Sequence, residues 1–276
     1  AESRGRVPPP YGTTLELRML LATLALWRRD IVRFYRQRSR IIGALGTPIV
    51  FWLLLGSGLG SSFRVGPTAA PEGGYLEYFF PGTLALIILF TAIFSTISVI
   101  EDRHDGFLQG VLVSPVPRSA IALGKILGGT TLALLQASLF LFLAPLANTQ
   151  INIASVPLLL AVLVILAFAL TSLGFVLAWM LDSTQGFHAI MNLLLFPMWL
   201  LSGAVFPASG AAGWIRGVML VNPMSYGVSA LRTVLTNPTI GTETASISIT
   251  RPLVFVATFG LVMLALSSWS VTHRRS

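Results

Sequence analysis

The chain has 276 residues, of which 54% are hydrophobic and only 10% are charged, and its mean hydropathy is +0.81. Soluble domains usually carry about 25% charged residues, so this composition excludes a water-soluble globule. The net charge of +8 does not indicate nucleic acid as a partner, because nine of the 18 basic residues lie before residue 41, ahead of the first long apolar run. That distribution is typical of a cytoplasmic segment at a membrane surface.

Residues 1–40 are predicted to form a cytoplasmic lead followed by an amphipathic helix over about 15–40. Apolar residues recur there at steps of three and four, and arginines crowd the second half. We expect this helix to lie in the membrane interface, with Trp27 and Tyr35 at headgroup depth and the arginines reaching phosphates. The alternative is a solvated basic helix that leads into the first span. The predicted interface residues are Trp27, Arg28, Arg29, Arg33 and Arg36.

Residues 41–276 contain six apolar runs, each long enough to cross a bilayer and none with a charge near its middle. The even connections and the two tails carry fourteen basic residues, against four in the odd connections. This bias predicts that both termini are cytoplasmic. The sequence therefore predicts an all-α membrane protein with six transmembrane helices. The predicted spans are 41–63, 79–100, 121–147, 155–181, 186–206 and 252–272.

The connection 207–251 is unusual because its first half is apolar. Residues 208–221 and 224–235 are each too short to cross a membrane. Between them, Asn222 and Pro223 provide a helix cap and a proline suited to a first helical position. We expect two short helices within 208–235 that dip into the outer leaflet and return. The alternative is a pair of surface helices packed on the external face.

A short charged segment, residues 101–118, joins the second and third spans. An acidic group precedes a glycine, a short apolar helix follows, and prolines end it. Such a helix is suited to docking on a soluble partner, whose groove would take the apolar face. The alternative is that the acids are solvated charges at a helix end. The candidate docking residues are Glu101, Asp102, Asp105, Gly106, Leu108, Leu112, Pro115 and Arg118.

Lys125 follows a glycine at the start of the third span. A phosphate-binding loop would need an upstream glycine, and Ser or Thr in place of Ile126. We therefore expect Lys125 to anchor lipid headgroups at the span boundary. We expect no catalytic, cofactor-binding or metal site in the chain. Gln136, midway along the third span, is interpreted as a structural hydrogen bond between helices, with contact to substrate as the alternative.

Two separated segments resemble the ABC-2 type exporter permeases. Residues 101–129 have the acidic cluster, the glycine, the leucine-bearing stretch, the proline turn and the Gly-Lys pair of that family's cytoplasmic signature. Residues 200–232 contain family-typical residues at Trp214, Asn222, Pro223, Tyr226 and Arg232. The chain departs from the usual signature at Arg103, His104 and Phe107.

The resemblance implies a six-span permease subunit that pairs with a second copy and binds two cytoplasmic ATP-binding cassette subunits. ATP and Mg²⁺ would be bound by those partners, so this chain would need no cofactor and would not itself be an enzyme. Segment 101–118 would contain the coupling helix, 15–40 the connecting helix and 208–235 the re-entrant helices. The protein would export a hydrophobic, lipid-linked or glycan-type substrate across a bacterial inner membrane. The alternative is an ion-coupled secondary transporter, a class that normally needs ionisable groups buried within its spans.

Overall fold

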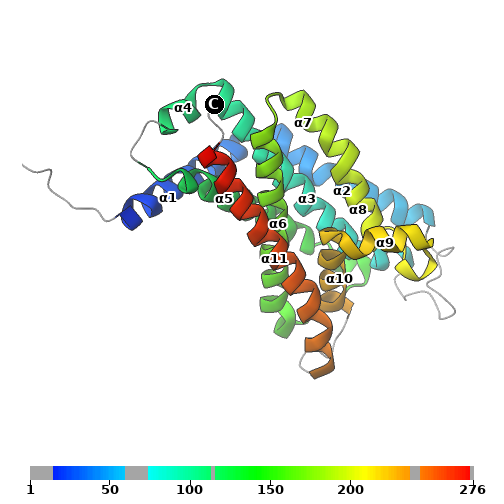
Figure 1. Cartoon of the computed structure of the whole chain (residues 1–276). Helices are drawn as coiled ribbons and strands as arrows, with labels where there is room; N and C mark the ends of the chain where they lie inside the picture. Colours follow the sequence, from blue (N-terminus) through cyan, green and yellow to red (C-terminus); the bar gives the residue numbers. More distant parts are fainter. Residues whose placement is uncertain (1–14, 60–73, 113–115, 237–242, 274–276) are drawn as a thin grey trace, which may run out of the picture.

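The computed structural model describes residues 15–59, 74–112, 116–236 and 243–273, and helices dominate all four stretches (Figure 1). Six helical segments among these residues are long and apolar enough to cross a membrane: Ile41–Leu59, Gly74–His104, Arg118–Leu141, Ile153–Met180, Thr184–Ala204 and Ile249–His273. The predicted all-helical fold is thus confirmed, and the number of candidate spans agrees with the predicted six. The elements are α1 (Leu15–Arg36), α2 (Arg38–Leu59), α3 (Gly74–His104), α4 (Phe107–Leu112), α5 (Arg118–Leu141), η2 (Ala144–Ala147), η3 (Ile153–Ser155), α6 (Val156–Met180), α7 (Thr184–Ile190), η4 (Met191–Leu195), α8 (Phe196–Trp199), η5 (Leu200–Ala204), η6 (Ala208–Gly210), α9 (Gly213–Val221), α10 (Pro223–Thr236) and α11 (Glu243–His273).

The observed helices follow the predicted apolar runs but differ at their ends. α3 and α11 are longer than predicted, because backbone hydrogen bonding continues beyond the apolar residues that mark a membrane core. α5 is shorter: it ends at Leu141, and residues 144–147 form a tight turn with Pro145 at its start. Residues 60–63 of the first predicted span lie outside the described residues.

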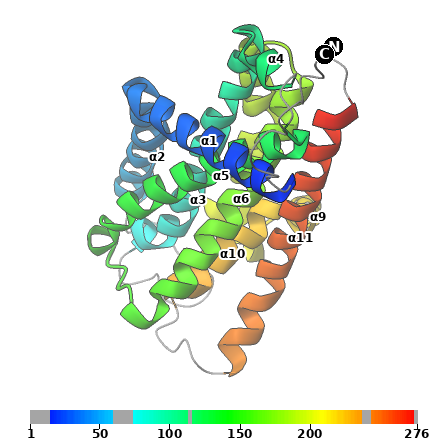
Figure 2. The same cartoon turned by 90° about the vertical axis from the view of Figure 1, so that its left-hand side faces the viewer.

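Figures 1 and 2 show that the two ends of the bundle carry different short helices. One end, called the α1 end below, has α1, α4 and the last turns of α11. The opposite end, called the α9 end, has α9, α10 and the first turns of α11. α1 crosses the bundle at an angle and packs chiefly against α5.

α3 is the central helix, and its side chains are buried along almost its whole length. α2, α5 and α6 pack around it. The rings of Trp52, Phe80 and Phe140 join three of these helices, with centroids 4.8–5.8 Å apart. The predicted hydrogen bond between helices is also present, since Thr91 Oγ1 of α3 lies 2.6 Å from Gln136 Oε1 of α5.

Glycines bring α1, α3, α5 and α6 into close contact. A Cβ atom at Gly124 would lie 3.0 Å from the carbonyl oxygen of Thr23, so this glycine lets the backbone of α1 rest on α5. A Cβ atom at Gly129 would overlap Ser95 Oγ of α3 and would lie 2.6 Å from Thr171 Cγ2 of α6. Small residues at such positions are the usual basis of tight helix packing in membranes.

Replacing Gly129 by alanine is expected to destabilise the folded chain by about 1–3 kcal/mol, because the added methyl group overpacks a three-helix contact. The measurement is the thermal unfolding midpoint of the purified protein in detergent. Gly217→Ala in α9 is the matched control, since no atom lies within 4 Å of a Cβ at that position. Equal midpoints for the two variants would show that the contact at Gly129 is not tight.

The fifth span is helical but irregular. Two π-helical stretches, η4 and η5, lie on either side of α8. Pro197 cannot donate an N–H to the helix, and its ring crowds the carbonyl of the preceding turn, which accounts for the widened turn at η4. At the α9 end the helix breaks, with Leu201 at ψ 19° and Gly203 in the left-handed region at φ 82°.

Candidate functional site

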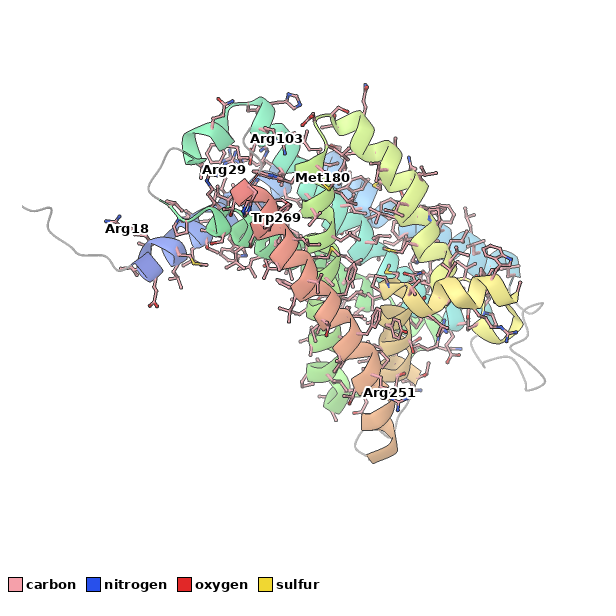
Figure 3. The ribbon with its side chains drawn as sticks, viewed as in Figure 1. Arg18, Arg29, Arg103, Met180, Arg251 and Trp269 are labelled. Carbon is pink, nitrogen blue, oxygen red and sulfur yellow. The ribbon has the colours of Figure 1, made fainter. Side chains whose placement is uncertain are left out.

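Six charged residues from three helices meet at the α1 end of the bundle. Three are acidic and three are basic, so their formal charges balance. They are called the charge cluster below: Arg29, Asp30 and Arg33 of α1, Glu101 and Asp102 of α3, and Lys125 of α5. Figure 3 labels Arg29 where α1 passes beneath α4 and the end of α3.

Asp102 is the centre of the charge cluster, and its side chain is fully buried. Arg29 donates two parallel hydrogen bonds to it, from Nη1 to Oδ2 at 2.7 Å and from Nη2 to Oδ1 at 2.6 Å. Arg33 and Lys125 donate one further bond each. A carboxylate accepts about four hydrogen bonds, so the Asp102 carboxylate is saturated. Its buried charge is therefore fully compensated by its neighbours.

Lys125 is not the headgroup anchor that the sequence predicts. The residue is 3% exposed, and its ammonium group donates to Asp30 Oδ1 at 2.9 Å, to Ser98 Oγ at 3.1 Å and to Asp102. The prediction was wrong because α1 lies over the start of α5 and covers this side chain. Gly124 makes that approach possible.

Two of the predicted interface arginines also turn towards the protein rather than towards phosphates. Arg29 pairs with Asp102, and its guanidinium lies 3.6 Å from the centre of the Phe107 ring. The hydrogen bond with Asp102 raises the pKa of Arg29 further above its ordinary value, so the group stays charged. Arg33 bonds Asp102 and also donates to Glu101 Oε2 at 2.9 Å.

The other predicted interface residues of α1 lie outside the charge cluster. Arg28 and Arg36 are exposed. Trp27 is half-buried and donates its indole N–H to Thr131 Oγ1 of α5 at 3.0 Å. Trp27 therefore helps to fix α1 on α5.

Asp30 is a member of the charge cluster that the sequence analysis missed. It is the only acidic residue between Glu16 and Glu72, and it stands among arginines on an amphipathic helix. A single carboxylate among arginines on such a helix is the pattern that could have indicated a buried ion pair. Burial raises the pKa of Asp30 above its ordinary value of 3.8, and the ammonium of Lys125 only partly offsets this effect.

The raised pKa of Asp30 predicts a pH dependence of stability. Folding favours the neutral carboxyl, so the stability from this group is present below pH 3.8 and is lost as the pH rises through the raised pKa. The advantage in unfolding midpoint of the parent chain over Asp30→Asn is therefore expected to decline from acidic to neutral pH. Asp182→Asn, at an exposed carboxylate, is the control. An advantage that grows with pH would contradict the assignment.

The turn between α3 and α4 contains a glycine that ends the charged run, as predicted. Gly106 has φ 71°, a conformation that other residues rarely adopt, and this turn lets α4 fold back over the bundle. The apolar face of α4 does not face outward, however. Leu108 is 2% exposed and packs in the protein's own core, as Phe107 and Val111 do in part. Among the α4 residues whose exposure the structure describes, those at the surface are Gln109 and Gly110, next to Asp105.

The remaining predicted docking residues are placed as follows. Leu112 is the last residue of α4, and Pro115 lies outside the described residues. Arg118 begins α5 and donates to the carbonyl of Thr272 in α11 at 3.0 Å, so it joins two helices at the α1 end. Glu101 is half-buried against Arg33, and only Asp105 of the predicted acids is well exposed.

Two residues that depart from the family signature tie α3 to α6. Arg103 donates to the carbonyl of Trp179 at 2.9 Å and to Asp182 Oδ1 at 2.9 Å. His104 Nε2 lies 2.7 Å from the carbonyl oxygen of Asp182. Figure 3 shows Arg103 next to the α6 end marked by Met180. The α1 end is thus held together at two places.

At the α9 end, the predicted pair of short helices is present as α9 and α10. Asn222 caps α10, since its Oδ1 accepts the N–H of Met224 at 2.9 Å, and Pro223 takes the first helical position. The Asn222 amide also donates to the carbonyl of Met198 at 2.6 Å. It thus satisfies a carbonyl of the broken fifth span.

The other predicted residues of this region have separate roles. Arg232 donates to the carbonyl of Gly203 at 3.1 Å and lies 4.3 Å from the centre of the Tyr78 ring, so it also braces the broken span. Tyr226 donates to the carbonyl of Leu220 at 2.7 Å and thereby joins α10 to α9. Trp214 is exposed.

Comparison with known proteins agrees with these features. Residues 22–236 match the family described as ABC-2 type transporter. Nodulation protein J of Rhizobium meliloti (strain 1021) is 26% identical over 216 residues, which is 77% of this chain and 80% of that protein. The daunorubicin resistance ABC transporter permease protein DrrB1 of Streptomyces coeruleorubidus is 22% identical over 218 residues, 76% of this chain and 74% of that protein. The chain therefore belongs to the ABC-2 type transporter family, whose members are membrane permease subunits that lack an ATPase domain.

Proposed function

We propose that this chain is one half of an ATP-driven exporter that receives mechanical work through α4. An ABC permease implies a partner ATP-binding subunit. The observation that carries the proposal is the position of α4, whose polar surface is exposed while its apolar face is packed on helices joined by the charge cluster. A push on α4 would reach α1, α3 and α5 together, because Asp102 of α3 binds residues of both α1 and α5.

The proposed assembly has two permease copies and two ATP-binding subunits, as the family resemblance implies. ATP and Mg²⁺ belong to the partners, and the family typically binds no cofactor itself. The proposed orientation places the α1 end and both termini in the cytoplasm of a bacterial cell, with the protein in the inner membrane. The excess of arginine around α1 supports this orientation.

α1 is proposed to be the connecting helix, lying in the cytoplasmic interface. One side of it packs on α5, while Leu17, Leu20, Leu21 and Leu24 are exposed. An exposed leucine stripe beside arginines is what an interfacial helix needs. α9 and α10 are proposed to be re-entrant helices in the outer leaflet. Their length supports this, since neither could cross a bilayer.

The proposed substrate is a hydrophobic, lipid-linked or glycan-type molecule. A cavity of about 330 Å³ between α2, α3 and α7 supports an amphiphile, because Phe94 and Ile97 line it together with Glu101 and His188. The cavity lies near the α1 end, where a molecule from the cytoplasm or the inner leaflet would arrive. Two relatives are named for nodulation and for daunorubicin resistance, and these names describe the relatives rather than this chain.

An ion-coupled secondary transporter is disfavoured by the same observations. Asp102 and Lys125 are ionisable groups buried in long helices, but they neutralise each other at one end of the bundle rather than midway. The test is reconstitution of the chain with its ATP-binding subunit in vesicles. Uptake of an amphiphile that needs ATP hydrolysis is expected. Transport that persists without ATP and follows an ion gradient would overturn the proposal.

A further inference from the structure

A cavity of about 510 Å³ opens at the α9 end, between α9, α10 and the first turns of α11. None of its residues belongs to the charge cluster or to α4. Figure 3 labels Arg251 at this end of α11, far from Trp269 near the other end. The residues that matter are Leu220 of α9, Ser225, Tyr226 and Ser229 of α10, and Arg251 of α11.

Two polar side chains of this cavity, Arg251 and Ser225, lack hydrogen-bond partners among the described residues. Among the residues that the structure describes, Arg251 has neither a hydrogen bond nor an ion pair, although it is exposed. The Ser225 hydroxyl oxygen is buried and also lacks a hydrogen-bond partner. Ser229 lies four residues further along α10, so it shares the same helix face. A cation and two hydroxyl groups from two helices thus line one space.

The surface next to these groups is apolar. The Tyr226 ring stacks on the ring of Phe255 in α11, with centroids 4.0 Å apart. Phe255, Val262 and Leu266 follow Arg251 at helical spacing along α11, and all three are exposed. This stripe continues towards the middle of a membrane-spanning helix. The site therefore has a cationic, hydroxyl-lined head and a long apolar wall.

The charge of the residues that line the cavity determines which kind of lipid headgroup fits it. Arg251 is the one charged residue among the described residues that line the cavity, and none of them is a carboxylate. A zwitterionic lipid would place an ammonium group in the cavity without a carboxylate to pair with it. A lipid whose phosphate carries a neutral alcohol headgroup has no ammonium group and avoids this cost. Arginine and hydroxyl donors are well suited to phosphate oxygens.

We propose that this cavity binds the phosphate of an anionic glycerophospholipid from the surrounding membrane, with an acyl chain along the Phe255–Val262–Leu266 stripe of α11. The bound lipid bridges α10 and α11 and stabilises their packing. This inference is independent of the transported substrate and of the coupling role of α4.

The test uses the purified full chain in detergent, with phosphatidylglycerol or phosphatidylcholine added in increasing amounts. The unfolding midpoint is expected to rise with phosphatidylglycerol at a much lower concentration than with phosphatidylcholine. Arg251→Gln should raise the half-saturating phosphatidylglycerol concentration about ten-fold, since it removes a charge-assisted contact. Ser229→Leu should do the same by filling the head of the cavity, while Arg251→Lys should retain part of the effect.

Arg28→Gln in α1 is the matched control, because Arg28 is also an exposed arginine but lies at the opposite end. It removes one general headgroup contact outside the cavity, so its half-saturating phosphatidylglycerol concentration should change much less than that of Arg251→Gln. An equal loss in Arg28→Gln and Arg251→Gln would mean general surface attraction and would overturn the proposal. So would an equal response to the two lipids, or full replacement of the lipid effect by inorganic phosphate.

Discussion

Replacing Lys125 by methionine is expected to destabilise the folded chain by about 3–5 kcal/mol, the usual cost of removing one partner from a buried ion pair. Methionine keeps most of the length of the side chain but leaves the Asp102 carboxylate one donor short in a place without solvent. Asp30 loses the same partner. The measurement is the unfolding midpoint in detergent, or the denaturant concentration at half unfolding. Lys125→Arg should cost less, because it keeps the charge.

A double variant tests whether the charge cluster acts as a unit. Lys125→Met combined with Asp102→Asn leaves two acids and two bases, so the remaining charges balance again. The double variant should therefore cost clearly less than the sum of the two single variants. Asp182→Asn breaks one exposed pair with Arg103 and should cost at most about 1 kcal/mol. Additive single and double variants would show that the residues do not depend on one another.

The sequence was sufficient for the membrane spans because apolar length is a local property. It was also sufficient for the break between α9 and α10, where Asn222 and Pro223 act on their own backbone neighbours. It was insufficient for Lys125. A basic residue at a span boundary can face lipid or another helix, and the choice depends on how α1 crosses α5. That crossing depends on the close approach of α1 to Gly124, and a glycine in an apolar run does not indicate which helix will pack against it.

The same limitation explains the error about α4. Its periodicity predicts a short helix with an apolar face, but an apolar face can be offered to a partner or to the protein itself. Gly106 decides between the two, since its left-handed turn folds α4 back so that Leu108 enters the core. Of the α4 residues whose exposure the structure describes, Gln109 and Gly110 are left for a partner, and no count of apolar positions would select them.

This exposed surface yields the prediction with the largest expected effect on activity. Gly110→Arg is expected to weaken binding of the ATP-binding subunit at least about ten-fold and to reduce ATP-dependent transport in proportion, if α4 is the docking helix. No atom of the chain lies within 4 Å of a Cβ at Gly110, so a long side chain meets only the partner. The permease itself should keep its unfolding midpoint. Binding is measured by co-purification and by titration of the ATP-binding subunit onto the reconstituted permease.

Gly217→Arg provides the matched control, because Gly217 is also an exposed helical glycine with open space around it, at the α9 end. If α4 faces the cytoplasm, the control should bind the ATP-binding subunit as the parent chain does. Reversed results for the two variants would place the ATP-binding subunit at the α9 end and would overturn the orientation together with the docking site. Unchanged binding in both would leave the orientation open and remove α4 from the interface. Because the two substitutions add the same charge and volume, the difference between them depends only on which end the partner contacts.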